Sequence, residues 1–280
     1  MTMEEDKYFV PPGHFYSPIP DRDEVQRHFD RISQTGSPAG IDFRDDFMRD
    51  TWLSLLPAMR RMPFGDDLSE QFRYYYMNDQ FSYGDAAALY AMLTIHRPKR
   101  FVEIGSGFSS ALALDTRTLE NLGTHFTFIE PFPGRLNNLL RPDDHSVVEV
   151  IEQKVQYVNL DVFSALEPGD VLFIDSSHVV KTGSDVCFEL LEILPILNRG
   201  VIVGIHDMFY PFEYPRSWCL DENRGWTELY MVRALLTFSV RYRIRFFNHY
   251  FGLRHHDLAS DPSVMFHKNF GGTLWLDVVS

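Results

Sequence analysis

Glycines and polar side chains at residues 103–110 have the composition of a ligand-binding turn. An apolar run ends in Glu103, Gly105, Ser106 and Gly107, and a segment with helical spacing begins at Ser109. In a strand–turn–helix unit, free backbone N–H groups and serine hydroxyls surround the bound group, and glycine lets that group approach the backbone closely. The pattern therefore predicts a site for a nucleotide-type cofactor.

Two acids bear on which cofactor this is. Glu130 ends the next β-rich run, where dinucleotide-binding folds carry the partner of a ribose hydroxyl. Glu103 lies beside the turn, where a carboxylate suits the cationic sulfonium of S-adenosylmethionine and would repel a pyrophosphate. Ser110 also replaces the third glycine of the dinucleotide fingerprint. S-adenosylmethionine is the predicted cofactor; NAD, and a buried Glu103 that only caps the loop, are the alternatives.

Two later β-rich runs are followed by Asp175 with His178 and by His206 with Asp207. Ligands of open α/β sheets bind at the carboxyl ends of the strands, so these side chains are expected to face the transferred group. Asp175 and Asp207 offer oxygen ligands to Mg²⁺ or Mn²⁺, and His206 offers a nitrogen ligand; such an ion would lower the pKa of a bound hydroxyl. The other interpretation is a hydrogen-bonded loop that positions substrate without a metal.

His178 is the predicted general base. An ordinary imidazole pKa of about 6.5 suits removal of a proton from a hydroxyl or an ammonium group. Further along, an aromatic stretch has the character of an acceptor pocket, because flat apolar faces pack on sugar and planar rings, although core packing explains it equally. Its members are Tyr210, Phe212, Tyr214, Trp218 and Trp226.

Apolar periodicity predicts the elements that must position these residues. We expect strands at residues 100–104, 124–130, 146–153, 170–175, 200–206, 242–247 and 272–279. Helices are expected at residues 21–32, 43–62, 84–95, 109–122, 133–140, 183–197 and 226–238, and a loop at 255–257. The predicted fold class is α/β, a Rossmann-like, doubly wound, mostly parallel seven-stranded sheet with an N-terminal helical extension.

The sequence also predicts how the chain is organised. Residues 1–97 form an N-terminal arm and a helical cap or flank, and residues 98–280 form the cofactor-binding catalytic domain. No Gly/Ser-rich or Pro-rich linker separates them, so one compact unit is expected. Residues 1–20 are rich in Pro, Gly and aromatic residues such as Tyr8 and Phe15, which predicts an extended arm that packs through its rings. The arm and first helices suit either a homodimer interface or a cap over the acceptor pocket.

Composition excludes several classes of function. The 280 residues are 45% hydrophobic and 23% charged, as in ordinary globular proteins. Lys and Arg number 26 against 39 Asp and Glu, and a net charge of −13 disfavours a nucleic-acid partner. No apolar run is long enough to cross a membrane, and the first residues do not resemble a signal peptide. Cys187 and Cys219 lack motif partners, so a cytoplasmic, reducing location is expected.

Residues 103–107 resemble motif I of the class I S-adenosylmethionine-dependent methyltransferases, in which Glu-x-Gly-x-Gly precedes an acid that binds the ribose. Further segments extend the resemblance over nearly the whole chain, to the bacterial group filed as methyltransferase family 24. These segments are Gly13–Pro20, Phe81–Asp85, Ile174–His178, and His206–Asp207 followed by Pro211–Pro215.

The resemblance implies roles for particular residues. They are Glu103, Gly105, Ser106 and Gly107 around the methionine part, Glu130 on the ribose, Asp161 on the adenine amino group, and Ser82 with Tyr83 closing over the cofactor. Related sugar O-methyltransferases carry a comparable Asp-x-x-His and a carboxylate pair, and they use Mg²⁺. Here His206 replaces one of those acids, which favours Mn²⁺ or a softer ion.

The predicted function is transfer of the methyl group of S-adenosylmethionine to a hydroxyl, or less readily an amine, of a small molecule. A sugar or glycoside is the expected acceptor class. The alternatives are an NAD-dependent oxidoreductase, favoured by the Gly-x-Gly turn with Glu130, and a non-catalytic cofactor-binding or scaffold protein.

Overall fold

The chain folds around one twisted sheet whose strands are short apolar runs. The computed structural model describes residues 9–32 and 37–280, so Tyr8 of the expected arm lies outside the described residues. Strand β4 reads Val-Leu-Phe-Ile and is buried along its whole length, as the middle of a parallel sheet covered on both faces requires. The strands are β1 (Arg100–Ile104), β2 (His125–Ile129), β3 (Val148–Ile151), β4 (Val171–Ile174), β5 (Ile202–Ile205), β6 (Tyr242–Phe247) and β7 (Leu274–Val278).

The strand order is β3-β2-β1-β4-β5-β7-β6. Strands β1 to β5 pair in parallel, while β7 runs antiparallel to both β5 and β6. This mostly parallel seven-stranded sheet confirms the predicted fold class. The chain winds outward in opposite directions from β1 and β4, and ligands of such sheets bind beyond the carboxyl ends of the strands at that point.

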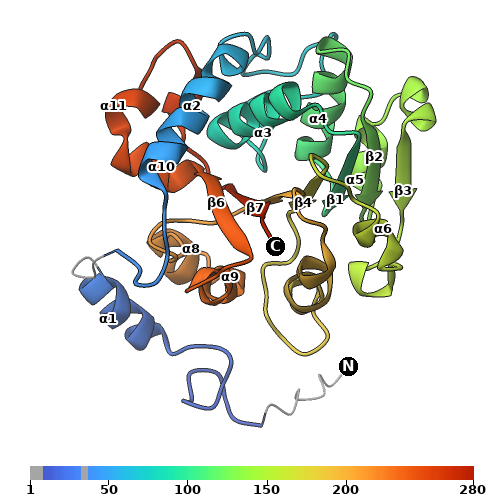
Figure 1. The fold of residues 1–280 in the computed structure, drawn as a ribbon. Helices are drawn as coiled ribbons and strands as arrows, with labels where there is room; N and C mark the ends of the chain where they lie inside the picture. The colour runs from blue at the N-terminus through green and yellow to red at the C-terminus, as the bar shows by residue number, and fades with distance from the viewer. Residues whose placement is uncertain (1–8, 33–36) are drawn as a thin grey trace.

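Helices surround the sheet (Figure 1), and most of the expected ones are present. They are α1 (Arg22–Ile32), α2 (Asp45–Met59), α3 (Tyr83–His96), α4 (Phe108–Leu119), α5 (Gly134–Leu139), α6 (Asp161–Ser164), α7 (Asp185–Phe188), α8 (Arg216–Leu220), α9 (Glu228–Leu236), α10 (Asn248–Arg254) and α11 (His256–Ala259). The expected helix at 183–197 breaks into α7, a π-helical turn (Glu189–Ile193) and a 3-10 turn (Leu194–Ile196). Pro195 has no backbone N–H to continue the helix. The loop expected at 255–257 is wrong in part, because α11 begins at His256.

Helix α3 is central to the packing. Its residues from Gly84 to Thr94 are all buried, and it contacts α2, α4 and the 3-10 turn at Met265–Lys268. A helix that is apolar all round is buried on all sides, so α3 is not a lid. The hydrophobic core runs from Phe43 to Val278 without a break at residue 98.

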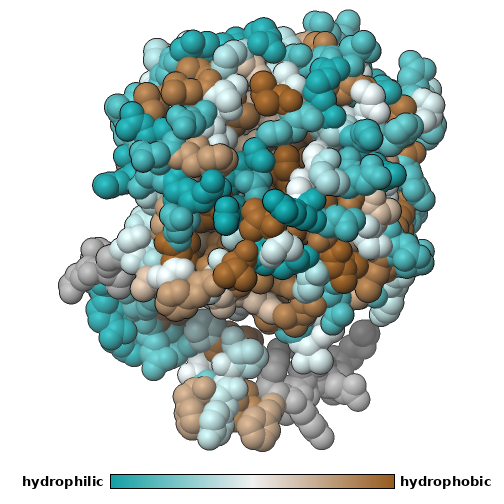
Figure 2. Space-filling view, viewed as in Figure 1, coloured by the Kyte–Doolittle hydropathy of each residue, from teal (hydrophilic) through white to brown (hydrophobic). Residues whose placement is uncertain are grey.

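The N-terminal segment behaves differently. Phe9, Phe15 and Tyr16 are 89%, 79% and 66% exposed, and they contact one another rather than the body of the protein. Figure 1 draws this arm and α1 apart from the sheet, and Figure 2 shows that its surface carries apolar groups. The rings therefore pack on one another within the arm, and the predicted homodimer interface or cap stays a prediction. Among the helices of the described residues, none combines the length and apolar character that a membrane span requires.

Candidate functional site

A cavity of about 650 Å³ opens where the strand ends meet. A second cavity of about 410 Å³ adjoins it, and the two share Gly105, Glu130, Asp175, Ser176 and Ser177 in their walls. Together they form one cleft along the carboxyl edge of the sheet. Nine of the twelve site residues predicted from the sequence line it: Gly105, Ser106, Gly107, Ser109, Glu130, Asp175, His178, His206 and Asp207.

The turn after β1 brings two strand ends into contact. Gly105 has φ +79°, and a Cβ atom there would lie 1.8 Å from the carbonyl oxygen of Asp175. The N–H of Asp175 donates to the carbonyl of Ile104 at 2.8 Å. Only glycine fits this crossing, because it has no side chain and tolerates a positive φ. The buried Oγ of Ser106 has no hydrogen-bond partner among the described residues, which fits a loop built to bind a polar ligand.

Glu103 does not face the cleft. Its side chain has no exposed surface and lies inside β1, where one carboxylate oxygen accepts a hydrogen bond from the hydroxyl of Ser110. The same hydroxyl accepts from the N–H of Gly107 at 3.1 Å. Burial raises the pKa of Glu103 to about 8, although bonds from Ser109 and Ser110 lower it. The expectation that the Glu103 carboxylate contacts the cofactor is therefore wrong. Glu103 instead stabilises the turn through its hydrogen bond with Ser110.

Glu130 lies at the cleft, and Asp161 and Tyr83 do not. The Glu130 carboxylate accepts a hydrogen bond from the N–H of Ser106 at 3.2 Å and lines both cavities. Asp161 is exposed on α6 and bonds to Asn159. Residues 154–156, at the 3-10 turn that begins at Val155, line the second cavity. The ring of Tyr83 stacks on Tyr76, while its neighbour Ser82 lines the cleft.

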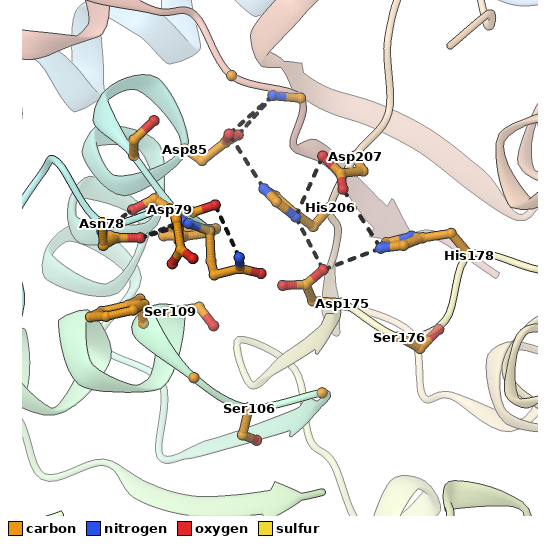
Figure 3. A pocket seen from close by; sticks show the side chains of 18 of the residues that line it. Asn78, Asp79, Asp85, Ser106, Ser109, Asp175, Ser176, His178, His206 and Asp207 are labelled. Carbon is orange, nitrogen blue, oxygen red and sulfur yellow. Dashed lines mark hydrogen bonds and ion pairs between the residues drawn. The ribbon is translucent and has the colours of Figure 1, made fainter. Parts of the chain in front are cut away.

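His206 is held between two carboxylates (Figure 3). Its Nδ1 lies 3.1 Å from Asp175 and its Nε2 lies 3.4 Å from Asp85. Burial alone would lower the pKa of His206, but the charges of Asp175 and Asp207 outweigh it, and the pKa is well above the ordinary value. The same histidine charge holds the pKa of Asp175 below its usual range, against the effect of burial. The neighbouring carboxylates therefore favour the protonated form of His206.

Asp85 is itself fixed by several donors, all of them buried. It accepts hydrogen bonds from the N–H groups of Gly272 and Thr273, the Thr273 hydroxyl and the Asn248 amide. Asp85 lies in one of the segments that resemble the family, Phe81–Asp85, but the sequence indicated no role for it. A single acid in an otherwise apolar, Ala-rich helix was the available signal.

His178 projects into the cleft from the loop after β4. Its Nε2 lies 3.5 Å from Asp175 and 3.6 Å from Asp207, and its Nδ1 lies 2.8 Å from Glu228. Burial lowers the pKa of His178, but these three carboxylates outweigh it and raise the pKa to about 10. The backbone at His178 has φ +60°, a conformation that costs a non-glycine residue about 1–2 kcal/mol. Such strain often marks a functional residue.

One group of side chains has the geometry of a metal site. Ligand atoms of Asp175, His178 and Asp207 all lie within 4.8 Å of one another. Two carboxylates and one imidazole suit Mn²⁺ and similar ions. This group contains His178 and not the His206 expected from the sequence.

Aromatic side chains line part of the cleft. Phe209, Trp218 and Trp226 line it, whereas Phe212 and Tyr214 are buried in the core. The guanidinium of Arg224 lies over both indoles, 4.0 Å from the Trp218 ring centroid and 4.6 Å from that of Trp226. Two of the five aromatic residues singled out in the sequence therefore line the cleft.

Comparisons with known proteins give a matching family model and a relative. Residues 102–208 match the family model described as a methyltransferase domain. An uncharacterized protein of Archaeoglobus fulgidus is 34% identical over 165 residues, which is 56% of this chain and 73% of that protein.

Two solved structures are also similar. An SAH-bound methyltransferase of Podospora anserina is 16% identical, with 94% of this chain and 99% of that one covered and a TM-score of 0.46. An O-methyltransferase of Streptomyces achromogenes involved in tomaymycin synthesis, in complex with SAM, is 12% identical, with 92% and 96% covered and a TM-score of 0.43.

Proposed function

We propose an acceptor class and a proton path for this chain, on the premise that it belongs to the class I S-adenosylmethionine-dependent methyltransferases, the family whose domain matches residues 102–208. That membership disfavours the NAD-dependent alternative. The proposed reaction transfers the methyl group to a hydroxyl of a small molecule, of the sugar or glycoside class. The sulfur–methyl bond breaks, an oxygen–methyl bond forms, S-adenosylhomocysteine leaves, and the hydroxyl proton goes to His178.

The observation that carries this proposal is the lining of the cleft. The glycine turn with Ser106 and Glu130, the indoles of Trp218 and Trp226, and His178 all line the same cavity. A donor bound at the turn and a ring packed on Trp218 and Trp226 would meet beside Asp175 and Asp207. Holding two reactants in this way can lower the barrier by about 7–11 kcal/mol, and proton removal adds about 10² to 10⁴ in rate.

The residues present fit a divalent cation, with Asp175 and Asp207 as its ligands and His178 facing the same point. A cation bound there would polarise the acceptor hydroxyl and offset the carboxylate charges that keep His178 protonated. His178 needs that offset to act as a base, because its pKa of about 10 leaves it protonated at neutral pH. His206 is not in the proposed ligand set.

Calorimetric titration tests the donor half of the proposal. The purified chain should bind S-adenosylhomocysteine saturably and should not bind NAD, and Mn²⁺ or Mg²⁺ should add heat of binding that Asp207→Ala removes. Binding of NAD alone would overturn the proposal.

Transfer of a radiolabelled methyl group to a panel of glycosides tests the acceptor half. His178→Ala should reduce turnover by about 10² to 10⁴ while the affinity for S-adenosylhomocysteine stays unchanged. Unchanged turnover in that variant removes His178 from the proton path. Full activity after exhaustive chelation removes the metal.

A further inference from the structure

The start of helix α9 holds the loop that carries His178. The carbonyl of His178 accepts hydrogen bonds from the N–H groups of Thr227 at 2.8 Å and Glu228 at 3.1 Å. The Thr227 hydroxyl accepts a hydrogen bond from the N–H of Val180 at 2.7 Å. The centroids of the Trp226 ring and the His178 imidazole lie 4.3 Å apart. These contacts maintain the left-handed backbone at His178. They come from a segment that lies beyond the matched methyltransferase domain.

The side chain of Glu228 completes this arrangement. It has no exposed surface, and its Oε2 lies 2.8 Å from His178 Nδ1. A carboxylate at one ring nitrogen of a histidine fixes both the orientation of the ring and the nitrogen that carries the proton. With Nδ1 directed at Glu228, Nε2 is the nitrogen that faces Asp175 and Asp207 in the cleft.

Among the described residues, His178 is the side chain that Glu228 contacts through a hydrogen bond. The second oxygen of Glu228, Oε1, is buried without a hydrogen-bond partner among the described residues, and His178 is the one side chain there with which Glu228 forms an ion pair. A second buried acid, Glu189, lies close enough for the Glu228 charge to raise its pKa further, after the larger effect of burial. Burial raises the pKa of Glu228 as well, while the hydrogen bond and charge of His178 lower it. A buried carboxyl group is costly unless it is paired, so the pairing with His178 accounts for the presence of Glu228.

We infer that Glu228 is the positioning residue of this site: it fixes His178 with Nδ1–H toward α9 and Nε2 toward the cleft, so that Nε2 receives the acceptor proton. The role in proton transfer rests on the proposed function. The orientation of the ring does not, and it can be measured without an acceptor.

Nuclear magnetic resonance of protein labelled with ¹⁵N-histidine measures the ring directly at one fixed pH. The signals that vanish in His178→Asn belong to His178. In the natural chain, the Nδ1 proton should exchange slowly with water because it is buried and bonded. Glu228→Leu removes the acceptor and should abolish that protection, while Glu228→Gln retains an acceptor oxygen and should keep part of it.

A second His–Glu pair in the chain provides the matched control. His28 lies 2.6 Å from Glu213, and Glu213 does not line either cavity of the cleft. Glu213→Gln should leave the His178 signals unchanged. Once an acceptor is found, Glu228→Gln should lower kcat by about 10- to 100-fold with KM for S-adenosylmethionine unchanged, and Glu213→Gln should alter neither.

The outcomes separate the two proposals. Wild-type protection of the Nδ1 proton in Glu228→Leu overturns the positioning role. If Glu228→Leu does not fold, Glu228→Gln provides the test. The positioning role is overturned if protection of the Nδ1 proton and kcat in Glu228→Gln both equal those of the natural chain. Absence of methyl transfer to any acceptor, with loss of protection in Glu228→Leu, leaves the orientation established and overturns the proposed reaction instead.

Discussion

At the scale of single residues, Gly105 shows how a missing side chain shapes the site. A Cβ there would overlap the backbone of Asp175. We expect Gly105→Ala to lower the free energy of unfolding by about 3 kcal/mol or more, since strain of about 1–2 kcal/mol at positive φ adds to that overlap. Affinity for S-adenosylhomocysteine should fall at least about tenfold. Urea unfolding and calorimetry measure the two effects.

Gly169 supplies the control for Gly105. It also has positive φ, +90°, but a Cβ atom there would meet nothing within 4 Å. Gly169→Ala should therefore cost only the backbone strain and leave ligand affinity unchanged. Equal effects of the two substitutions would mean that the overlap at Asp175 relaxes freely, and that the turn is less rigid than its geometry indicates.

Glu103 gives a prediction about pH. Burial raises its pKa from the model-peptide value of 4.5 to about 8 in the folded chain, so the folded state binds its proton more tightly than the unfolded state does. The stabilising effect of that proton is complete below pH 4.5 and is lost as pH rises toward 8, by up to about 1.4 kcal/mol per pH unit. Glu103→Gln removes the titration. Its stability relative to the natural chain should therefore increase with pH between 5 and 8 in urea unfolding experiments.

The matched substitution for Glu103 is Glu149→Gln, on the exposed side of edge strand β3. It removes one exposed carboxylate and no buried group, so it should change the free energy of unfolding by no more than about 0.5 kcal/mol. A stability difference for Glu103→Gln that does not change with pH would show that Glu103 titrates alike in the folded and unfolded states.

At the scale of elements, α3 and β7 are joined through Asp85. Its carboxylate accepts hydrogen bonds from the start of β7 and from Asn248 at the start of α10, and it lies beside His206. Asp85→Ala leaves these buried donors and the histidine charge without their partner, and we expect a loss of about 3–5 kcal/mol in unfolding free energy. Asp66→Ala removes an exposed ion pair with Lys268 and should cost under about 1 kcal/mol. Similar urea midpoints for the two variants would contradict this role.

Element boundaries explain which parts of the site could be predicted from sequence. The strands were found because each is an apolar run, and residues just beyond their ends, such as Asp175 and Asp207, do line the cleft. Glu103 was misplaced because it lies inside β1, paired with Phe128 and Phe173 in the register. A side chain within a strand points to a face of the sheet and not to its edge.

Contacts between distant segments could not be predicted. Glu228 reaches His178 across 50 positions of sequence, and a single acid at a helix start carries no local pattern that indicates its partner. The same holds for α10 and α11, which are too short for periodicity to separate from loop. Asp161 was expected at the adenine because of the order of motifs along the chain. In the structure, residues 154–156 line the second cavity and Asp161 does not.

At the scale of the whole molecule, the core links the segments on either side of residue 98. Trp52 of α2 stacks on Phe246 of β6 and on Phe251 of α10, and α3 packs on α4. Burial of this kind stabilises both segments together, which favours one folded unit over two. The chain should therefore unfold as one cooperative unit, apart from the exposed arm.

Scanning calorimetry with a bound ligand tests whether the chain unfolds as one cooperative unit. S-adenosylhomocysteine is proposed to bind in the cleft, and at 100 times its Kd it should add about 2.7 kcal/mol to the folded state. For a chain of this size the single transition should move upward by roughly 5 °C or more, and NAD should not move it. Because α2 and α3 share the core with the sheet, their unfolding should shift with the rest. A separate, unshifted transition would show instead that residues 1–97 fold as a domain of their own.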